Sequence, residues 1–139
     1  MHSANIKVVR DAYAAFGRGD MAALLACVTD DIRWQPAIGT APHVPFSGER
    51  QGKAGVAEFF RLVAETEVFE EFAPQRFIAQ DDAVVALGHY RAVARATGRR
   101  FESDFVMVFT LNDGLICGFK EFTDSAAVNE AFAGAPVHA

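Results

Sequence analysis

Residues 112–124 read NDGLICGFKEFTD, and this stretch decides how the second half of the chain folds. The NDG triplet at 112–114 is a strong hairpin-turn signal, and the apolar residues after it predict a strand. Adjacent residues in a strand point to opposite faces of the sheet. Lys120 and Glu121 therefore face opposite ways, and one of them faces whatever the sheet covers.

Three further strands are expected before this hairpin. An Asp pair at 81–82 and a TGR triplet at 97–99 mark the turns between them. Consecutive strands joined by short turns predict an antiparallel meander. The four strands are expected at 67–79, with a break or bulge at Pro74, and at 83–96, 100–111 and 115–123.

The first half of the chain is predicted to be helical, because apolar residues recur there at the spacing of one helix face. Residues 35–51 interrupt this pattern with a loop rich in proline and glycine, and Asp124 caps a last helix that runs through Phe132. Helices followed by a strand meander predict an α+β domain with its helices on one face of the sheet. The apolar faces are Ile6, Val9, Tyr13 and Phe16, then Met21, Leu24, Leu25 and Val28, then Val56, Phe59, Phe60 and Val63.

Composition indicates a single packed domain over residues 1–139. Hydrophobic residues make up 51% of the chain and charged residues 22%, which excludes a disordered protein. The net charge of -5 argues against nucleic acid as a partner, and no apolar run is long enough to span a membrane. The N-terminus lacks the apolar core of a signal peptide, so we expect a cytoplasmic protein.

No spacing typical of a metal site or a bound cofactor is found in the sequence. Cys27 and Cys117 are far apart and are not part of a Cys/His cluster. Each is expected to be a small hydrophobic residue with a reduced thiol. We therefore expect neither a metal nor a cofactor.

The order of elements and three stretches of sequence resemble one protein family. These stretches are AYAAFGRGDMAALLACVTDDIRW at 12–34, FSGERQGKAGVAEFF at 46–60 and the hairpin at 112–124. Together they resemble the SnoaL-like branch of the NTF2-like superfamily, and most closely its ketosteroid-isomerase-related members, over residues 4–133. The resemblance implies a cystatin-like cone: a strongly curved, mostly antiparallel sheet wrapped around three helices, with an apolar pocket at its open end. It also implies a homodimer formed through the sheet.

Members of this superfamily include isomerases, polyketide cyclases, epoxide hydrolases, dehydratases and binding proteins. The isomerase roles fall on unsuitable residues here. The position of the carboxylate base falls near Gln35 or Pro36, and the position of the acid falls on Phe105 or Val106. The position of the tyrosine falls near Ala12, so that Tyr13 is one residue away, about 100° around a helix. The familiar isomerase mechanism is therefore not expected.

Glu121 is the candidate acid/base by resemblance to the cyclases. Alignment with the last strand of the family puts Phe119, Glu121 and Thr123 on the pocket side and Lys120 outside. A carboxyl group beside phenylalanine rings is poorly solvated, which raises its pKa toward neutrality, as a general acid/base requires. The alternative is that Glu121 is structural and accepts a hydrogen bond from Trp34 or pairs with an arginine.

A looser resemblance to the epoxide hydrolases would combine Arg100 and Glu102 with Glu121. The alternation of Phe101, Phe105, Met107 and Phe109 predicts that Arg100 and Glu102 face away from the core, which argues against this set.

The remaining candidates are residues expected around the pocket. Alternation along residues 83–96 does not decide which face is inward, so that a pocket role for His89 and Arg91 stays open. His43 lies in the proline-rich loop and is either at the pocket mouth or merely exposed. The ligand-binding candidates are Tyr13, Phe16, Trp34, His43, Phe46, Phe60, His89, Arg91, Phe105, Met107 and Phe119.

These observations predict a protein that binds a small, hydrophobic, oxygenated molecule, with acid/base catalysis of the isomerase, cyclase or dehydratase type by Glu121. The alternative is a non-catalytic ligand-binding or dimerisation module, which the unsuitable isomerase positions favour.

Overall fold

The computed structural model describes residues 2–36 and 41–133. The first half of the chain contains three helices and two strands, and the second half contains four strands and a final helix. The elements are α1 (His2–Gly17), α2 (Met21–Leu25), β1 (Val28–Gln35), β2 (Arg50–Gln51), α3 (Gly52–Thr66), β3 (Glu67–Gln80), β4 (Ala83–Ala94), β5 (Arg100–Asn112), β6 (Leu115–Phe122) and α4 (Ser125–Ala133).

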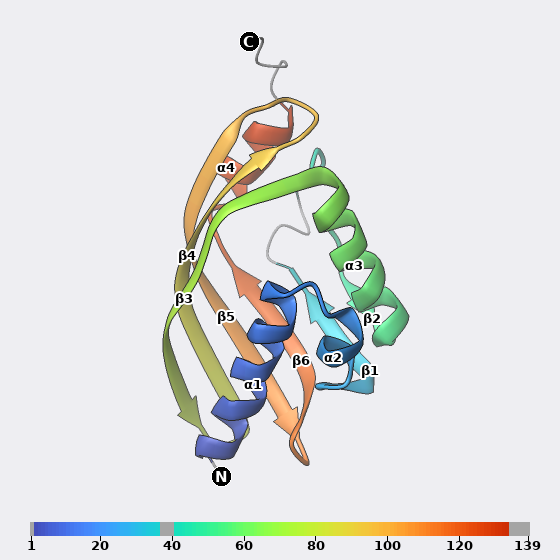
Figure 1. The fold of residues 1–139 in the computed structure, drawn as a ribbon, viewed down its shortest axis with the longest axis vertical. Coiled ribbons are helices and arrows are strands. Elements are labelled where there is room, and N and C mark those ends of the chain that lie inside the picture. The colour runs from blue at the N-terminus through green and yellow to red at the C-terminus, as the bar shows by residue number, and fades with distance from the viewer. Residues whose placement is uncertain (1, 37–40, 134–139) are drawn as a thin grey trace.

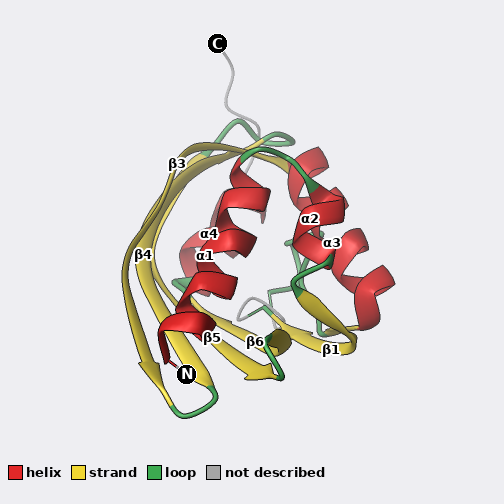
Figure 2. Cartoon of the chain, turned by 60° about the horizontal axis from the view of Figure 1, so that its bottom comes forward, coloured by secondary structure: helices red, strands yellow, loops and turns green. Residues whose placement is uncertain are grey.

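The six strands form one sheet in the order β2-β1-β6-β5-β4-β3. Neighbouring strands are antiparallel except β1 and β6, which run parallel. The sheet is strongly curved and α1 lies in its concave side, with α2 and α3 next to it (Figures 1 and 2). The α+β architecture expected from the sequence is confirmed.

The curvature of the sheet coincides with two irregularities in β3. The pairing of β3 with β4 shifts register between Phe69 and Glu71 and again between Pro74 and Arg76. A β-bulge bends the strand that carries it and increases its twist. The break expected at Pro74 is therefore confirmed. The other bulge, after Phe69, also helps this long edge strand to follow the curve.

The second helix is shorter than its pattern predicts. The Asp20 side chain accepts a hydrogen bond from the Ala23 amide at 3.0 Å and begins α2, but the helix ends at Leu25. Val28 is instead the first residue of β1 and pairs with Ile116 of β6. Val28 fits the spacing of a helix face but is the buried first residue of a strand. Periodicity alone does not distinguish these two cases.

The loop expected at 35–51 contains more structure than predicted. Its last two residues form β2, which pairs with β1, and Phe46 is buried against Phe59 of α3 and Phe132 of α4. Residues 37–40, which belong to the same loop, lie outside the described residues.

The core lies between the helices and the concave face of the sheet. In β4 every second residue is buried, and the inward residues are Val84, Ala86, Gly88, Tyr90, Ala92 and Ala94. Cys27 and Cys117 are free thiols, as expected. Within residues 2–36 and 41–133, no helix is both long and apolar enough to cross a membrane.

Gly88 is expected to be required for packing. A Cβ atom at this position would press on the ring of Phe105 and lie 2.5 Å from the carbonyl oxygen of Ala73. Because a backbone atom and a fully buried ring cannot both move aside, Gly88→Ala should lower the free energy of unfolding by about 1–3 kcal/mol, measured by urea denaturation.

Gly118→Ala is the matched control, since Gly118 is also a strand glycine. Its nearest neighbour to an added Cβ is the Cβ of Thr110 at 3.4 Å, an ordinary contact. Its stability should stay within about 0.5 kcal/mol of the wild type. Equal losses in both variants would contradict the steric argument.

Candidate functional site

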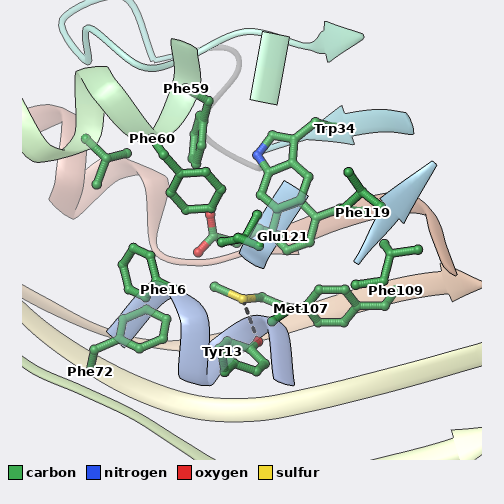
Figure 3. Close-up of a pocket in the computed structure, with 15 residues that line it drawn as sticks. Tyr13, Phe16, Trp34, Phe59, Phe60, Phe72, Met107, Phe109, Phe119 and Glu121 are labelled. Carbon is green, nitrogen blue, oxygen red and sulfur yellow. Dashed lines mark hydrogen bonds between the residues drawn. The ribbon is translucent and has the colours of Figure 1, made fainter. Parts of the chain in front are cut away.

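An apolar cavity of about 80 Å³ lies between α1, α3 and the inner face of the sheet (Figure 3). It is larger than the 10–15 Å³ that one water molecule needs, and smaller than the roughly 150 Å³ of an engineered cavity that binds benzene. The lining residues are Ala12, Tyr13, Phe16, Leu24, Val28, Trp34, Phe59, Phe60, Val63, Phe72, Met107, Phe109, Ile116, Phe119 and Glu121.

Among the described residues, Glu121 is the only one that brings a carboxyl group to this wall. It lies on β6 opposite Met107 of β5, and only 9% of its surface is exposed. Lys120 is exposed on the other face, as the alignment with the family's last strand implied. Among the described residues, neither a hydrogen bond nor a charged partner contributes to the pKa of the Glu121 carboxyl group, and burial is the one cause of its shift. Burial in this apolar wall raises its pKa to about 7.

Trp34 brings a hydrogen-bond donor to the same cavity. Its indole ring stacks on Phe119 with ring centroids 3.8 Å apart, and its Nε1 lies on the side of the ring toward α3 (Figure 3). This buried N–H has no partner among the described residues, although buried indole N–H groups normally have one. The hydrogen bond expected between Trp34 and Glu121 is therefore absent, and so is the expected pairing of Glu121 with an arginine.

Tyr13 occupies a third polar position in the wall. Its hydroxyl group donates a hydrogen bond to the Met107 sulfur at 2.9 Å (Figure 3). Burial, and then the charge of Glu121, raise its pKa well above the usual range, so that Tyr13 stays protonated. Both Ala12 and Tyr13 line the cavity, so the offset of one residue from the isomerase tyrosine does not turn Tyr13 away from it.

Six of the predicted ligand-binding residues lie in the cavity wall. These are Tyr13, Phe16, Trp34, Phe60, Met107 and Phe119. Two further candidates, Phe46 and Phe105, are buried elsewhere in the core; Phe105 stacks on Phe72 with centroids 5.2 Å apart and does not reach the cavity.

The placement of three polar candidates at the pocket was wrong. His89 lies on the outer face of the sheet, where its ring nitrogens lie 2.9 Å from Asp104 and Glu102. Arg91 lies on the same face and pairs with Glu70. His43 is exposed, and its backbone amide donates to the Asn129 side chain.

The three residues of the epoxide-hydrolase interpretation do not meet. Arg100 donates to Glu70, and Glu102 contacts His89, so both lie on the outer face. Glu121 lies on the inner face. The alternation of the phenylalanines along β5 predicted this separation correctly.

The sequence analysis missed a second buried acid, Glu67. It is the first residue of β3, it is only 5% exposed, and its Oε2 has no hydrogen-bond partner among the described residues. Burial, and then the charge of Glu121, raise its pKa to about 8. A signal was available, because Glu67 continues the spacing of Phe60 and Val63 on the inward face of α3.

No group of three or more His, Cys, Asp or Glu side chains is arranged to hold a metal ion in the part of the chain that the structure describes. The polar groups that face the cavity are the Glu121 carboxyl group and the Trp34 and Tyr13 donors. This set is suited to proton transfer and to hydrogen bonding with an oxygen atom of a bound molecule.

Comparison with known proteins agrees with this geometry. The SnoaL-like domain matches residues 9–119. No curated protein sequence matches the chain. An NTF2-like protein from Burkholderia xenovorans LB400 is 29% identical, with a TM-score of 0.86 over 95% of this chain and 98% of the other.

Two other solved structures are similarly close. An NTF2-like protein of unknown function from Burkholderia pseudomallei K96243 is 30% identical, with a TM-score of 0.83 over 94% of this chain and 98% of the other. TerC, co-crystallised with polyporic acid, is 26% identical, with a TM-score of 0.81 over 94% of this chain and 99% of the other.

Proposed function

Because the chain belongs to the SnoaL-like domain family, of the NTF2-like superfamily, we propose that it binds a small, apolar, oxygen-bearing molecule in the cavity and that Glu121 exchanges a proton with that molecule. One observation carries the proposal. A buried carboxyl group with no partner among the described residues faces an apolar cavity, where it costs stability that a structural role would not require.

The need for an oxygen atom on the ligand follows from the unpaired donor. The Trp34 N–H is desolvated in the wall, and a ligand oxygen would supply the acceptor that the protein lacks. The rest of the wall offers almost only carbon, so the body of the ligand would be apolar. TerC, which was crystallised with polyporic acid, supplies a first compound to try.

The expected homodimer is also part of this proposal. Large apolar side chains are exposed on the strands, with 42% of Val68, 43% of Ile78 and 47% of Phe122 accessible. Phe122 is adjacent to Glu121 and so lies on the outer face of the sheet, which is the face through which the family resemblance implies pairing.

The binding test compares two ligands with one carbon skeleton, 2-tetralone and tetralin. Both ligands are larger than the cavity of about 80 Å³, so side chains of its wall must move to admit them. Because that wall is apolar, calorimetry should show that both bind. Trp34→Phe should weaken the binding of 2-tetralone by about three- to tenfold, which is the loss of one hydrogen bond, and leave tetralin unchanged. Polyporic acid is the third ligand.

Tetralin serves as the internal control, since it tests the packing of the altered ring without the ketone. Equal losses for both ligands would show that Trp34 contributes shape and no hydrogen bond. If none of the three compounds binds, the proposed function is contradicted.

A further inference from the structure

Glu67 is a buried acid at the junction of α3 and β3. Its backbone amide ends α3 by donating to the carbonyl of Val63, which any residue would do. The nearby acids Glu70 and Glu71 pair with arginines on the outer face. Glu67 alone points inward, where its Oε2 is buried without a partner among the described residues.

Glu67 lines a second hollow, of about 380 Å³, next to the cavity of Glu121. Phe16, Phe60 and Val63 line both spaces. The rings of Phe16 and Phe60, whose centroids are 5.4 Å apart, belong to the wall of both spaces. A ligand larger than the inner cavity would displace side chains of its wall, and this shared wall separates it from the second hollow.

We propose that Glu67 is the second proton-carrying group of this site, and that a bound molecule lies between it and Glu121 once Phe16 and Phe60 have moved. This inference rests on the proposed function. The two acids reach the ligand from opposite walls, Glu67 from the junction of α3 and β3 and Glu121 from β6.

The electrostatic environment divides the roles between the two acids. They lie close enough for the charge of Glu121 to raise the pKa of Glu67, so the pair resists holding two negative charges. Among the described residues, Tyr13 and Tyr90 also face these acids, and burial raises the pKa of both hydroxyl groups so that they stay protonated. Asp20 and Arg61 also line the second hollow but are engaged with Arg18 and Glu65. Near neutral pH the two acids then share one negative charge and one proton, which supplies a base and an acid in the same site.

A ketone illustrates the step with its atoms and electrons balanced. The Glu121 carboxylate takes a proton from the carbon next to the carbonyl, and the electron pair of that C–H bond becomes the C=C bond of an enol. The π pair of the C=O bond moves to oxygen, which takes the proton of Glu67. Reversal with a deuteron from heavy water leaves deuterium on the carbon and consumes no oxidant or reductant.

The first test needs no ligand. Protein labelled with ¹³C at the glutamate carboxyl carbons is titrated by NMR. Two carboxyl groups should titrate well above the ordinary glutamate range, and Glu121→Gln should lower the midpoint of Glu67. If Glu67 titrates in the ordinary range, or if Glu121→Gln leaves its midpoint unchanged, the pair does not exist and the inference is overturned.

The second test measures deuterium incorporation into 2-tetralone in heavy water. Glu67→Gln should slow the turnover of bound ketone about 10²-fold with little change in its binding. Glu71→Gln is the matched control, an exposed acid on the same strand, and should keep the wild-type rate. If Glu67→Gln does not fold, Glu67→Met replaces it with an apolar side chain of similar length.

The outcomes separate this inference from the proposed function. Loss of exchange in Glu121→Gln with full exchange in Glu67→Gln overturns the role of Glu67 and leaves that of Glu121 standing. Absence of exchange in the wild-type protein, with 2-tetralone bound, overturns proton transfer by both acids and leaves a binding protein.

Discussion

Raising the pH from about 5 to about 8 is expected to lower the free energy of unfolding of the wild-type protein by at least roughly 3 kcal/mol. The cause is the burial of Glu67 and Glu121, which raises their pKa values from 4.5 to about 8 and about 7. In this pH range the folded protein holds protons that the unfolded chain has released. Stability is therefore greatest on the acid side and falls as the pH rises toward the folded pKa values.

The variant that tests this is the double substitution Glu67→Gln and Glu121→Gln. It removes both titrations, so its stability should change little with pH, as measured by urea denaturation across the range. The effects of the two acids should not simply add, because the pKa of Glu67 already contains repulsion from Glu121. Single variants should each remove part of the slope.

His89 also makes the folded protein less stable as the pH rises, and it accounts for the pH dependence that remains without the two acids. His89 has a raised pKa because it is hydrogen-bonded to Asp104 and Glu102, so its contribution is also lost as the pH rises. The double variant retains His89, and the slope that remains in it measures this contribution. A slope in the double variant as steep as that of the wild type would show that the buried acids are not responsible.

The faces of β5 and β6 could be predicted from the sequence, but the face of β4 could not. Along β5 the inward residues are large and apolar, so that alternation decides the register. Four of the six inward residues of β4 are small, namely Ala86, Gly88, Ala92 and Ala94, and at Gly88 the ring of Phe105 fills the space that a side chain would take. Both faces of β4 contain apolar residues, so hydropathy does not identify its inward face. The small size of most inward side chains does, because little space is left on the concave side.

The position of Glu121 could be predicted, whereas its lack of partners could not. Strand alternation puts Lys120 and Glu121 on opposite faces, and the alignment with the family's last strand places Glu121 inward, beside the apolar Phe119. Whether Trp34 reaches it depends on how the indole stacks on Phe119, which no local pattern contains. Glu67 was missed although its spacing from Phe60 and Val63 pointed inward, because residues 67–71 contain three acids. The bulge after Phe69 accompanies the outward position of the other two, Glu70 and Glu71.

The second large effect is expected in catalysis. Glu121→Gln should slow deuterium exchange into bound 2-tetralone by about 10²- to 10⁴-fold, the range typical of a lost general base. The amide has nearly the shape of the carboxyl group but cannot take a proton from carbon. Binding of tetralin, which calorimetry measures separately, should stay within about twofold of the wild type, because the apolar wall is intact.

The pH profile gives this prediction a second, independent reading. The wild-type rate should rise as Glu121 ionises, with a midpoint near its pKa of about 7, and fall as Glu67 loses its proton near about 8. Glu102→Gln is the matched control, the same chemical change on the outer face of the sheet, and should keep both the rate and the profile. If Glu121→Gln exchanges at the wild-type rate, Glu121 is not the base; if it loses tetralin binding as well, Glu121 holds the cavity in shape and its role is structural.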